Sequence, residues 1–228
     1  MTDTPLASPP ARGRPWTAAS LIGDGWRAIK ADPSLILVML LVMVVANLID
    51  IAFSIAGEIV GGDAQTFLEI AGAVLNLPLN AWITVGWLRY ILAAMRGERP
   101  GIGVVFAGGP VLAMLGMYVV YAVCVLLGLV LLIVPAFILV CGWWVAGFSI
   151  VDRHKGPIQC LADSWALTRG YKWEIMLLLI LEFLIVVAGL LACGVGIFVA
   201  LPIVAASSTA LYQRLIGEEP TLGAPAVR

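Results

Sequence analysis

Charged residues are scarce in this 228-residue sequence: Asp, Glu, Lys and Arg together make up 12% of it. A soluble domain carries about 25% charged residues. Hydrophobic residues reach 62%, so the chain cannot cover a surface that faces water, and lipid is its expected solvent. The few basic residues form no stripe of the kind that binds nucleic acid, so no nucleic-acid partner is expected.

Histidine and cysteine are also scarce. The single histidine, His154, has no second histidine with which to form a paired metal site. The four cysteines show no CxxC spacing, and three lie in apolar runs, which is typical of small core residues. No glycine-rich stretch follows a strand, as a phosphate-binding loop would. We therefore expect no metal, no cofactor and no catalytic residue, and the chain is not expected to be an enzyme.

Long apolar runs are what the sequence does contain. Each of six runs is long enough to span a bilayer, which takes about 20 residues. The second run is expected to be interrupted at Pro78. The first begins only after Pro33 and lacks an A-x-A exit, so it is expected to be a retained anchor and not a cleaved signal. The runs cover residues 34–57, 67–95, 110–127, 135–151, 173–193 and 198–215.

The thirteen basic residues fall only in alternate gaps between these runs. The gaps after the first, third and fifth runs contain none. This asymmetry obeys the positive-inside rule, so both termini are expected in the cytoplasm of a bacterium, with the chain crossing the inner membrane several times. The basic residues are Arg12, Arg14, Arg27, Lys30, Arg89, Arg96, Arg99, Arg153, Lys155, Arg169, Lys172, Arg214 and Arg228.

Two amphipathic segments, 16–31 and 157–172, precede the first and fifth runs. Their expected apolar faces are Ile22, Trp26 and Ile29 in one, and Ile158, Leu161 and Trp165 in the other. Pro157 suits the first helical position of the second segment. Such helices lie in the headgroup layer, so we expect lipid contacts, with simple anchoring as the alternative. The residues expected to make them are Trp26, Lys30, Trp165, Arg169 and Lys172.

The expected fold is an all-α integral membrane protein with six transmembrane helices arranged as three hairpins, each preceded by a cytoplasmic interfacial segment. The membrane domain covers residues 16–216, between a disordered tail at 1–15 and a short tail at 217–228. Asp24-Gly25-Trp26 parallels Asp163-Ser164-Trp165, while the middle hairpin keeps only Phe106 at the corresponding place. This parallel fits either an ancient threefold repeat or two coincident interfacial tryptophans.

The stretch from Asp163 to Gly170, Asp-Ser-Trp-Ala-Leu-Thr-Arg-Gly, resembles a Ser-Trp-x-Leu-Thr-x-Gly signature. That signature belongs to an uncharacterised bacterial multi-span family, similar to the YciC-type proteins and to the membrane domain fused to some glycerophosphodiester phosphodiesterases. Gly25-Trp26, the 132–135 segment, Pro202 and Leu211-Tyr212 agree with it, although Ala136 stands where the family usually has Gly. The resemblance implies a six-helix bundle. It carries over no phosphodiesterase activity, because no such domain is fused here.

Glu182 is the most unusual residue of the spans. It lies about nine residues into the fifth run, roughly 13 Å from its start. A carboxylate at that depth costs a few kcal/mol on insertion scales. At matching depth on the sixth run lie Ser207, Ser208 and Thr209. The group is either a protonatable relay or ion site, or an interhelical hydrogen bond that holds two helices together.

A second polar group is expected between the first two runs, at Asn47, Asp50, Asn76 and Asn80. It fits either polar helix packing or a transporter site at a broken helix. Because soluble loops are short, we favour a non-enzymatic scaffold or accessory protein of the inner membrane. Membrane lipids are its expected partners, with a second copy of the chain or another membrane protein as further candidates. The alternative is a small oligomeric transporter or channel that uses the intramembrane Glu or the Asn cluster.

Overall fold

The computed structural model describes residues 16–131, 133–192, 194 and 196–221, and over these residues the fold is all-α with no strand. The expected fold class is confirmed at this level. The expected tail at 1–15, and most of the one at 217–228, lie outside the described residues. The helices are α1 (Ala18–Ala31), α2 (Ser34–Val60), α3 (Gly62–Met95), α4 (Gly103–Phe106), α5 (Val111–Leu131), α6 (Ile133–Trp143), α7 (Ala146–Arg153), α8 (Pro157–Leu167), α9 (Lys172–Leu191) and α10 (Ile197–Leu215).

Six helical stretches are long and apolar enough to cross a membrane, so the chain is a multi-pass membrane protein. All six match the runs expected from the sequence, with ends that shift by a few residues. The stretches are Ser34–Val60, Ala64–Met95, Val111–Gly128, Ala136–Arg153, Lys172–Leu191 and Ile197–Leu215.

The expected interruption at Pro78 is wrong, because α3 runs unbroken from Gly62 to Met95. Membrane helices tolerate proline where nearby groups bond to the backbone. The carbonyl that Pro78 leaves without its N–H donor is that of Val74, and close to it the Asn80 side chain donates to the Asn76 carbonyl at 3.3 Å. The break occurs instead in the fourth span, where α6 ends at Trp143 and α7 begins at Ala146.

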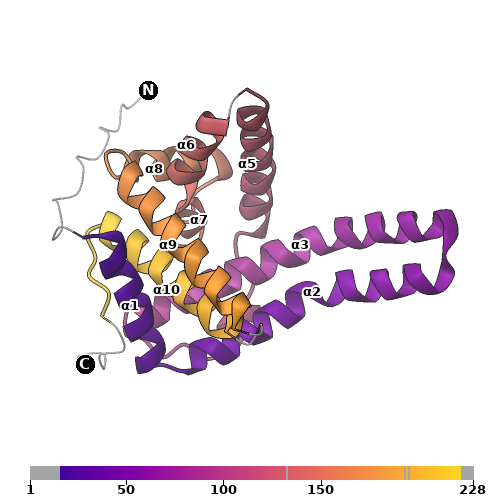
Figure 1. Ribbon diagram of the computed structural model, residues 1–228, viewed down its shortest axis with the longest axis horizontal. Helices are drawn as coiled ribbons and strands as arrows, with labels where there is room; N and C mark the ends of the chain where they lie inside the picture. Colours follow the sequence, from indigo (N-terminus) through magenta and orange to yellow (C-terminus); the bar gives the residue numbers. More distant parts are fainter. Residues whose placement is uncertain (1–15, 132, 193, 195, 222–228) are drawn as a thin grey trace.

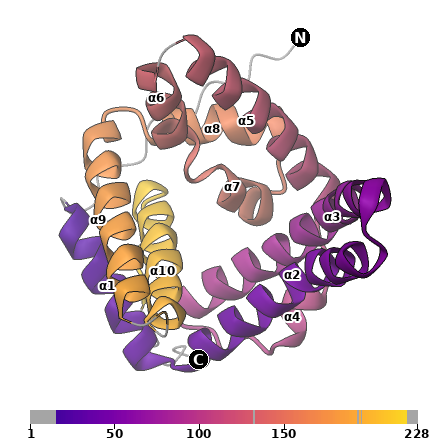
Figure 2. The same ribbon diagram turned by 45° about the vertical axis from the view of Figure 1, so that its right-hand side comes forward.

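Helices that follow one another in the chain pack together in three pairs, α2 with α3, α5 with α6 and α9 with α10. These pairs surround α7 (Figure 2). A shorter helix precedes each pair, and we call α1, α4 and α8 the lead helices. Each lead helix packs on another pair: α4 on α3, α8 on α5, α6 and α7, and α1 on α10 and α9. The first lead helix, α1, therefore packs against the last pair, α9 and α10.

Glycine allows each lead helix to approach its neighbour closely. A Cβ atom on Gly25 would lie 2.5 Å from the Ser207 hydroxyl oxygen and 2.6 Å from the Ile203 carbonyl oxygen. A Cβ atom on Gly86 would overlap the Val105 carbonyl. Glycine suits these contacts, because an added Cβ atom would displace backbone atoms at Gly25 and Gly86 and the Trp165 ring at Gly142. The contacts that join lead helices to pairs in this way are Gly25–Ser207, Gly86–Val105 and Gly142–Trp165.

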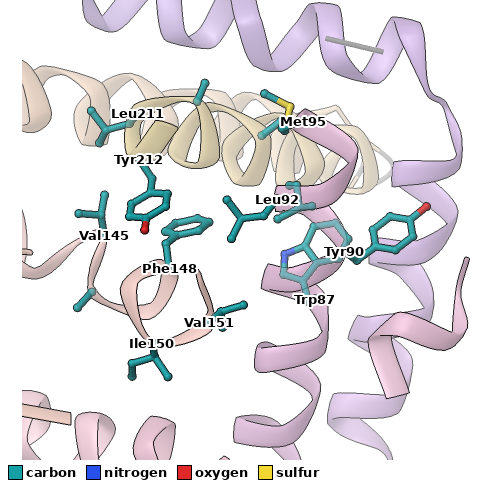
Figure 3. Packing of buried hydrophobic residues seen from close by; sticks show 14 of the residues in the cluster. Trp87, Tyr90, Leu92, Met95, Val145, Phe148, Ile150, Val151, Leu211 and Tyr212 are labelled. Carbon is teal, nitrogen blue, oxygen red and sulfur yellow. The ribbon is translucent and has the colours of Figure 1, made fainter. Parts of the chain in front are cut away.

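The second and third pairs and α1 form the body of the molecule, and the far parts of α2 and α3 extend away from it (Figure 1). The most buried span is α10, with 61% of its residues inside the protein, against 17% for α2 and α5. Figure 3 shows its Tyr212 ring stacked on Phe148 of α7, with centroids 5.3 Å apart. A helix buried along most of its length fixes the position of its polar residues, so α10 organises the candidate site.

Candidate functional site

Glu182 lies on the buried face of α9, with only 3% of the residue exposed. Ile175, Leu178 and Glu182 follow at spacings of three and four, which places them on one side of a helix. The Ser208 hydroxyl of α10 donates to Glu182 Oε1 at 3.1 Å. Glu182 Oε2 is buried and has no hydrogen-bond partner among the described residues.

Trp144, in the fourth span, is also connected to this contact between α9 and α10. Its indole Nε1 donates to the Ser208 hydroxyl at 3.0 Å, so Trp144, Ser208 and Glu182 form a chain of two hydrogen bonds. Trp144 lies in the break between α6 and α7. Sequence reasoning missed it, because nothing in the fourth run except Gly142 signals a break and a tryptophan there is typical of an interface.

The other two hydroxyls expected at this site do not reach Glu182. Ser207 donates to the Ile203 carbonyl at 2.8 Å, and Thr209 donates to the Ala205 carbonyl at 2.7 Å. Hydroxyls in membrane helices commonly bond to the carbonyl four residues earlier. Glu182 and Ser208 are therefore the members of the expected cluster that the structure brings together.

The second polar group joins α2 to α3. The Asn76 side chain donates to the Asp50 carboxylate, and the Asn80 side chain lies 3.4 Å from the Ala46 carbonyl. Asn47 stays outside this group, since it is exposed and donates to the Met43 carbonyl of its own helix at 2.7 Å. Three of the four expected residues thus link the two helices.

The lead helix α1 places Trp26 and Lys30 on its exposed side. Trp26 is 44% exposed, and the Lys30 ammonium lies 5.1 Å from the centre of its ring. Of the expected apolar face, Ile29 is buried, Ile22 is half-buried and Trp26 faces outward, and the buried face of the helix also contains Asp24 and Gly25. Packing against α10 decides this, since Arg214 provides a charged partner for the Asp24 carboxylate.

Trp165 of α8 is paired with a lysine in a similar way, and this lysine, Lys172, is the first residue of α9. Trp165 is 36% exposed, and the Lys172 ammonium lies 3.2 Å from the centre of its ring. Of the expected apolar face, Leu161 is buried and Ile158 is 72% exposed. Arg169 is exposed in the turn that follows the helix.

Two hydroxyls of the Ser-Trp-x-Leu-Thr stretch hold α8 in place. Ser164 and Thr168 donate to the Gly142 carbonyl at 2.9 and 3.1 Å, beside the break between α6 and α7. The segment expected to run to residue 172 ends as a helix at Leu167. A glycine with positive φ, Gly170 at 92°, follows the helix.

A network of charges that sequence reasoning missed connects the ends of α3, α7 and α10. Arg96 Nη1 donates to Asp152 at 2.8 Å and Arg96 Nε donates to Glu218 at 3.0 Å, while the Tyr212 hydroxyl donates to Asp152 at 2.9 Å. The Asp152 carboxylate raises the pKa of Arg96 above its ordinary value, although burial acts in the opposite direction. The basic residues thus cross-link segments that lie far apart in the sequence.

Two cavities lie between the helices. An apolar one of about 310 Å³ is bordered by α3, α5, α6 and α7 and has Trp144 in its wall. A polar one of about 330 Å³ lies where α1, α2 and α3 meet, next to Ser34 and Met95. Neither of the two is lined by Glu182.

No protein-family model, curated protein or solved structure matches this chain. The functional argument therefore depends on the geometry described above.

Proposed function

We propose that the protein is a non-enzymatic scaffold or accessory protein of the bacterial inner membrane, whose lead helices α1 and α8 bind anionic lipid headgroups. In this proposal the chain forms three hairpins, both termini are cytoplasmic, and α1 and α8 lie at the inner headgroup level. The tryptophan rings contact the acyl boundary and the basic residues contact the headgroups.

The proposal rests on two similar contacts between a tryptophan and a lysine, Trp26–Lys30 and Trp165–Lys172. In each pair a lysine ammonium lies near an exposed indole ring. Tryptophan and lysine side by side suit the membrane interface, where one group is apolar and the other contacts water and phosphate. Two helices from distant parts of the chain present the same chemistry.

The charges around these pairs support the same function. Asp24 pairs with Arg27 and Arg214, and Asp163 pairs with Lys155, so the acidic residues of both lead helices are neutralised within the protein. Among the described residues, no ion pair includes Lys30, Arg169 or Lys172. These three basic residues remain available to lipid phosphates.

Salt dependence of lipid binding tests the proposal with the unaltered chain. We expect tighter binding to nanodiscs or vesicles with an anionic lipid than to phosphatidylcholine alone, because each basic contact near the surface contributes about 1 kcal/mol. Raising the salt from 0.1 M to 1 M shortens the screening length from about 10 Å to about 3 Å and should abolish the preference. A preference for anionic lipid that does not change with salt would contradict the proposal.

A second candidate function is a small proton-coupled transporter, and one observation favours it. Glu182 Oε2 lacks a partner in a buried site, and the chain from Glu182 through Ser208 ends at Trp144, which lines the apolar cavity. A buried ionisable residue in a span commonly marks a proton or ion pathway.

Glu182→Gln separates the two candidates. In a scaffold the amide still accepts from Ser208, so apparent Tm and lipid binding stay within error of the unaltered protein. In a transporter the substitution removes a titrating proton and abolishes pH-dependent flux in proteoliposomes while the protein still folds. Ser207→Ala is the matched control, because Ser207 is adjacent on α10 and does not bond to Glu182.

A further inference from the structure

We infer that the polar cavity between α1, α2 and α3 binds a zwitterionic aminophosphate, the phosphoethanolamine headgroup of a membrane lipid. The cavity has a volume of about 330 Å³. Small-molecule sites begin at roughly this size, so it suits a headgroup better than a larger ligand.

The position of the cavity favours a lipid. Its wall includes Ser34, the first residue of α2, and Met95, the last residue of α3. Both residues stand at the ends of membrane-spanning stretches that the basic residues of the sequence assign to the same side. A cavity at the ends of two spans lies at the depth of the headgroups.

The charges that line the cavity specify a zwitterion. Asp32 and Glu98 contribute two carboxylates and Arg99 contributes one guanidinium, a net charge of −1. Among the described residues, none of these three takes part in an ion pair within 4.0 Å, so the opposite charges stay apart around the space. A ligand with an ammonium and a phosphate group can contact both signs at once.

The Asp32 carboxylate is held in place from within the protein. Ser34 donates to Asp32 Oδ1 through its hydroxyl at 2.5 Å and through its backbone N–H at 3.1 Å. The Tyr90 hydroxyl lies 3.2 Å from the Ser34 hydroxyl, and Tyr90 is 3% exposed. The buried tyrosine thus positions the serine, and the serine positions the carboxylate. Among the described residues, no hydrogen bond includes Asp32 Oδ2, which can accept from an ammonium group.

The same lining disfavours other headgroups. A purely anionic phosphate would meet a net negative charge. A choline group cannot donate hydrogen bonds to carboxylates and is recognised by a cage of several aromatic rings. Tyr90 is the one aromatic side chain that the described part of the chain contributes to this wall. A primary ammonium is therefore the cation that the site accepts. This inference does not depend on the lipid binding proposed for α1 and α8.

Calorimetric titration of the detergent-solubilised full chain tests the inference. The probes are the short-chain lipids dihexanoyl phosphatidylethanolamine, dihexanoyl phosphatidylcholine and dihexanoyl phosphatidylglycerol, and soluble phosphoethanolamine. We expect saturable binding of the phosphatidylethanolamine at one site. Glu98→Gln and Arg99→Gln should each weaken it about tenfold or more, because each removes a charged hydrogen bond. Glu58→Gln makes the same charge change as Glu98→Gln at an exposed position near the opposite end of α2 and should leave affinity unchanged.

The remaining results of the titration each support or overturn the inference. Equal affinity for phosphatidylethanolamine and phosphatidylcholine, or unaltered binding in both cavity variants, would overturn the inference. Soluble phosphoethanolamine that binds more tightly than the lipid would assign the site to a free metabolite and overturn the lipid as its occupant. Weaker binding of phosphoethanolamine than of the lipid, with the same loss in Glu98→Gln, supports the headgroup assignment. Apparent Tm of each variant confirms that it is folded.

Discussion

Asp24→Ala is expected to lower the free energy of unfolding by about 3 kcal/mol, the lower end of the range for breaking a buried ion pair. Asp24 is 1% exposed, and its carboxylate contacts Arg214, whose side chain is 23% exposed. Removal of the carboxylate leaves Arg214 partly buried without its charge partner, and Arg214 Nε already has no hydrogen-bond partner within the part of the chain that the structure describes. The partial exposure of Arg214 keeps the loss at the lower end.

The measurement is apparent Tm in detergent, which should fall by about 6–12 °C for a chain of this size. Arg27→Ala removes the other partner of the same carboxylate and is the control. Arg27 is 62% exposed, so its loss should cost at most about 1 kcal/mol. The double change Asp24→Ala with Arg214→Met should recover part of the stability, because neither charge remains unpaired. Equal losses for Arg27→Ala and Asp24→Ala would contradict the contact between α1 and α10.

The combined change Arg169→Glu and Lys172→Glu is expected to weaken association with anionic lipid about thirtyfold. Each basic contact with an anionic surface is worth about 1 kcal/mol, and two such losses correspond to that factor. Adding Lys30→Glu should bring the total loss to about 150-fold, since it removes the third free basic residue. Repulsion between the new carboxylates and phosphate acts in the same direction.

Binding to nanodiscs that contain phosphatidylglycerol measures this loss, with apparent Tm as the check on folding. Arg12→Glu with Arg14→Glu makes the same change in net charge outside the lead helices, and it should reduce affinity by a smaller factor. If the triple variant binds anionic lipid as tightly as the unaltered chain, the proposed headgroup binding is contradicted. The helices α1 and α8 would then only anchor the protein at the membrane.

Much of the fold follows from local sequence. A run of about 20 apolar residues forms a helix in lipid because every backbone group must be hydrogen-bonded within it. This is why the six spans could be placed to within a few residues. The break at Trp144 could not be predicted, because it coincides with the bonds from Ser164 and Thr168 to the Gly142 carbonyl, more than 20 residues away.

The burial of a polar residue could be predicted only where its position along a membrane-spanning helix determines its partner. Glu182 and Ser208 lie at matching depth on consecutive spans, and counting residues from the turn between them is enough to pair them. Charge alone favours an exposed position for Asp24. Its actual burial depends on Arg214, 190 residues later, and on a glycine beside it that admits α10. No local pattern contains that information.

The central claim is that α1 and α8 lie in one leaflet at the depth of the headgroups, and spin-label depth measurement tests it most directly. Labels at Arg27→Cys and Ile158→Cys, in a chain whose native cysteines are replaced by alanine, occupy positions that are 62% and 72% exposed. Comparing relaxation by oxygen and by a water-soluble nickel complex gives the depth of each label in reconstituted bilayers. We expect both labels at headgroup depth and both protected from impermeant reductant added outside cells. A label at the bilayer centre, or the two labels in opposite leaflets, would contradict the account.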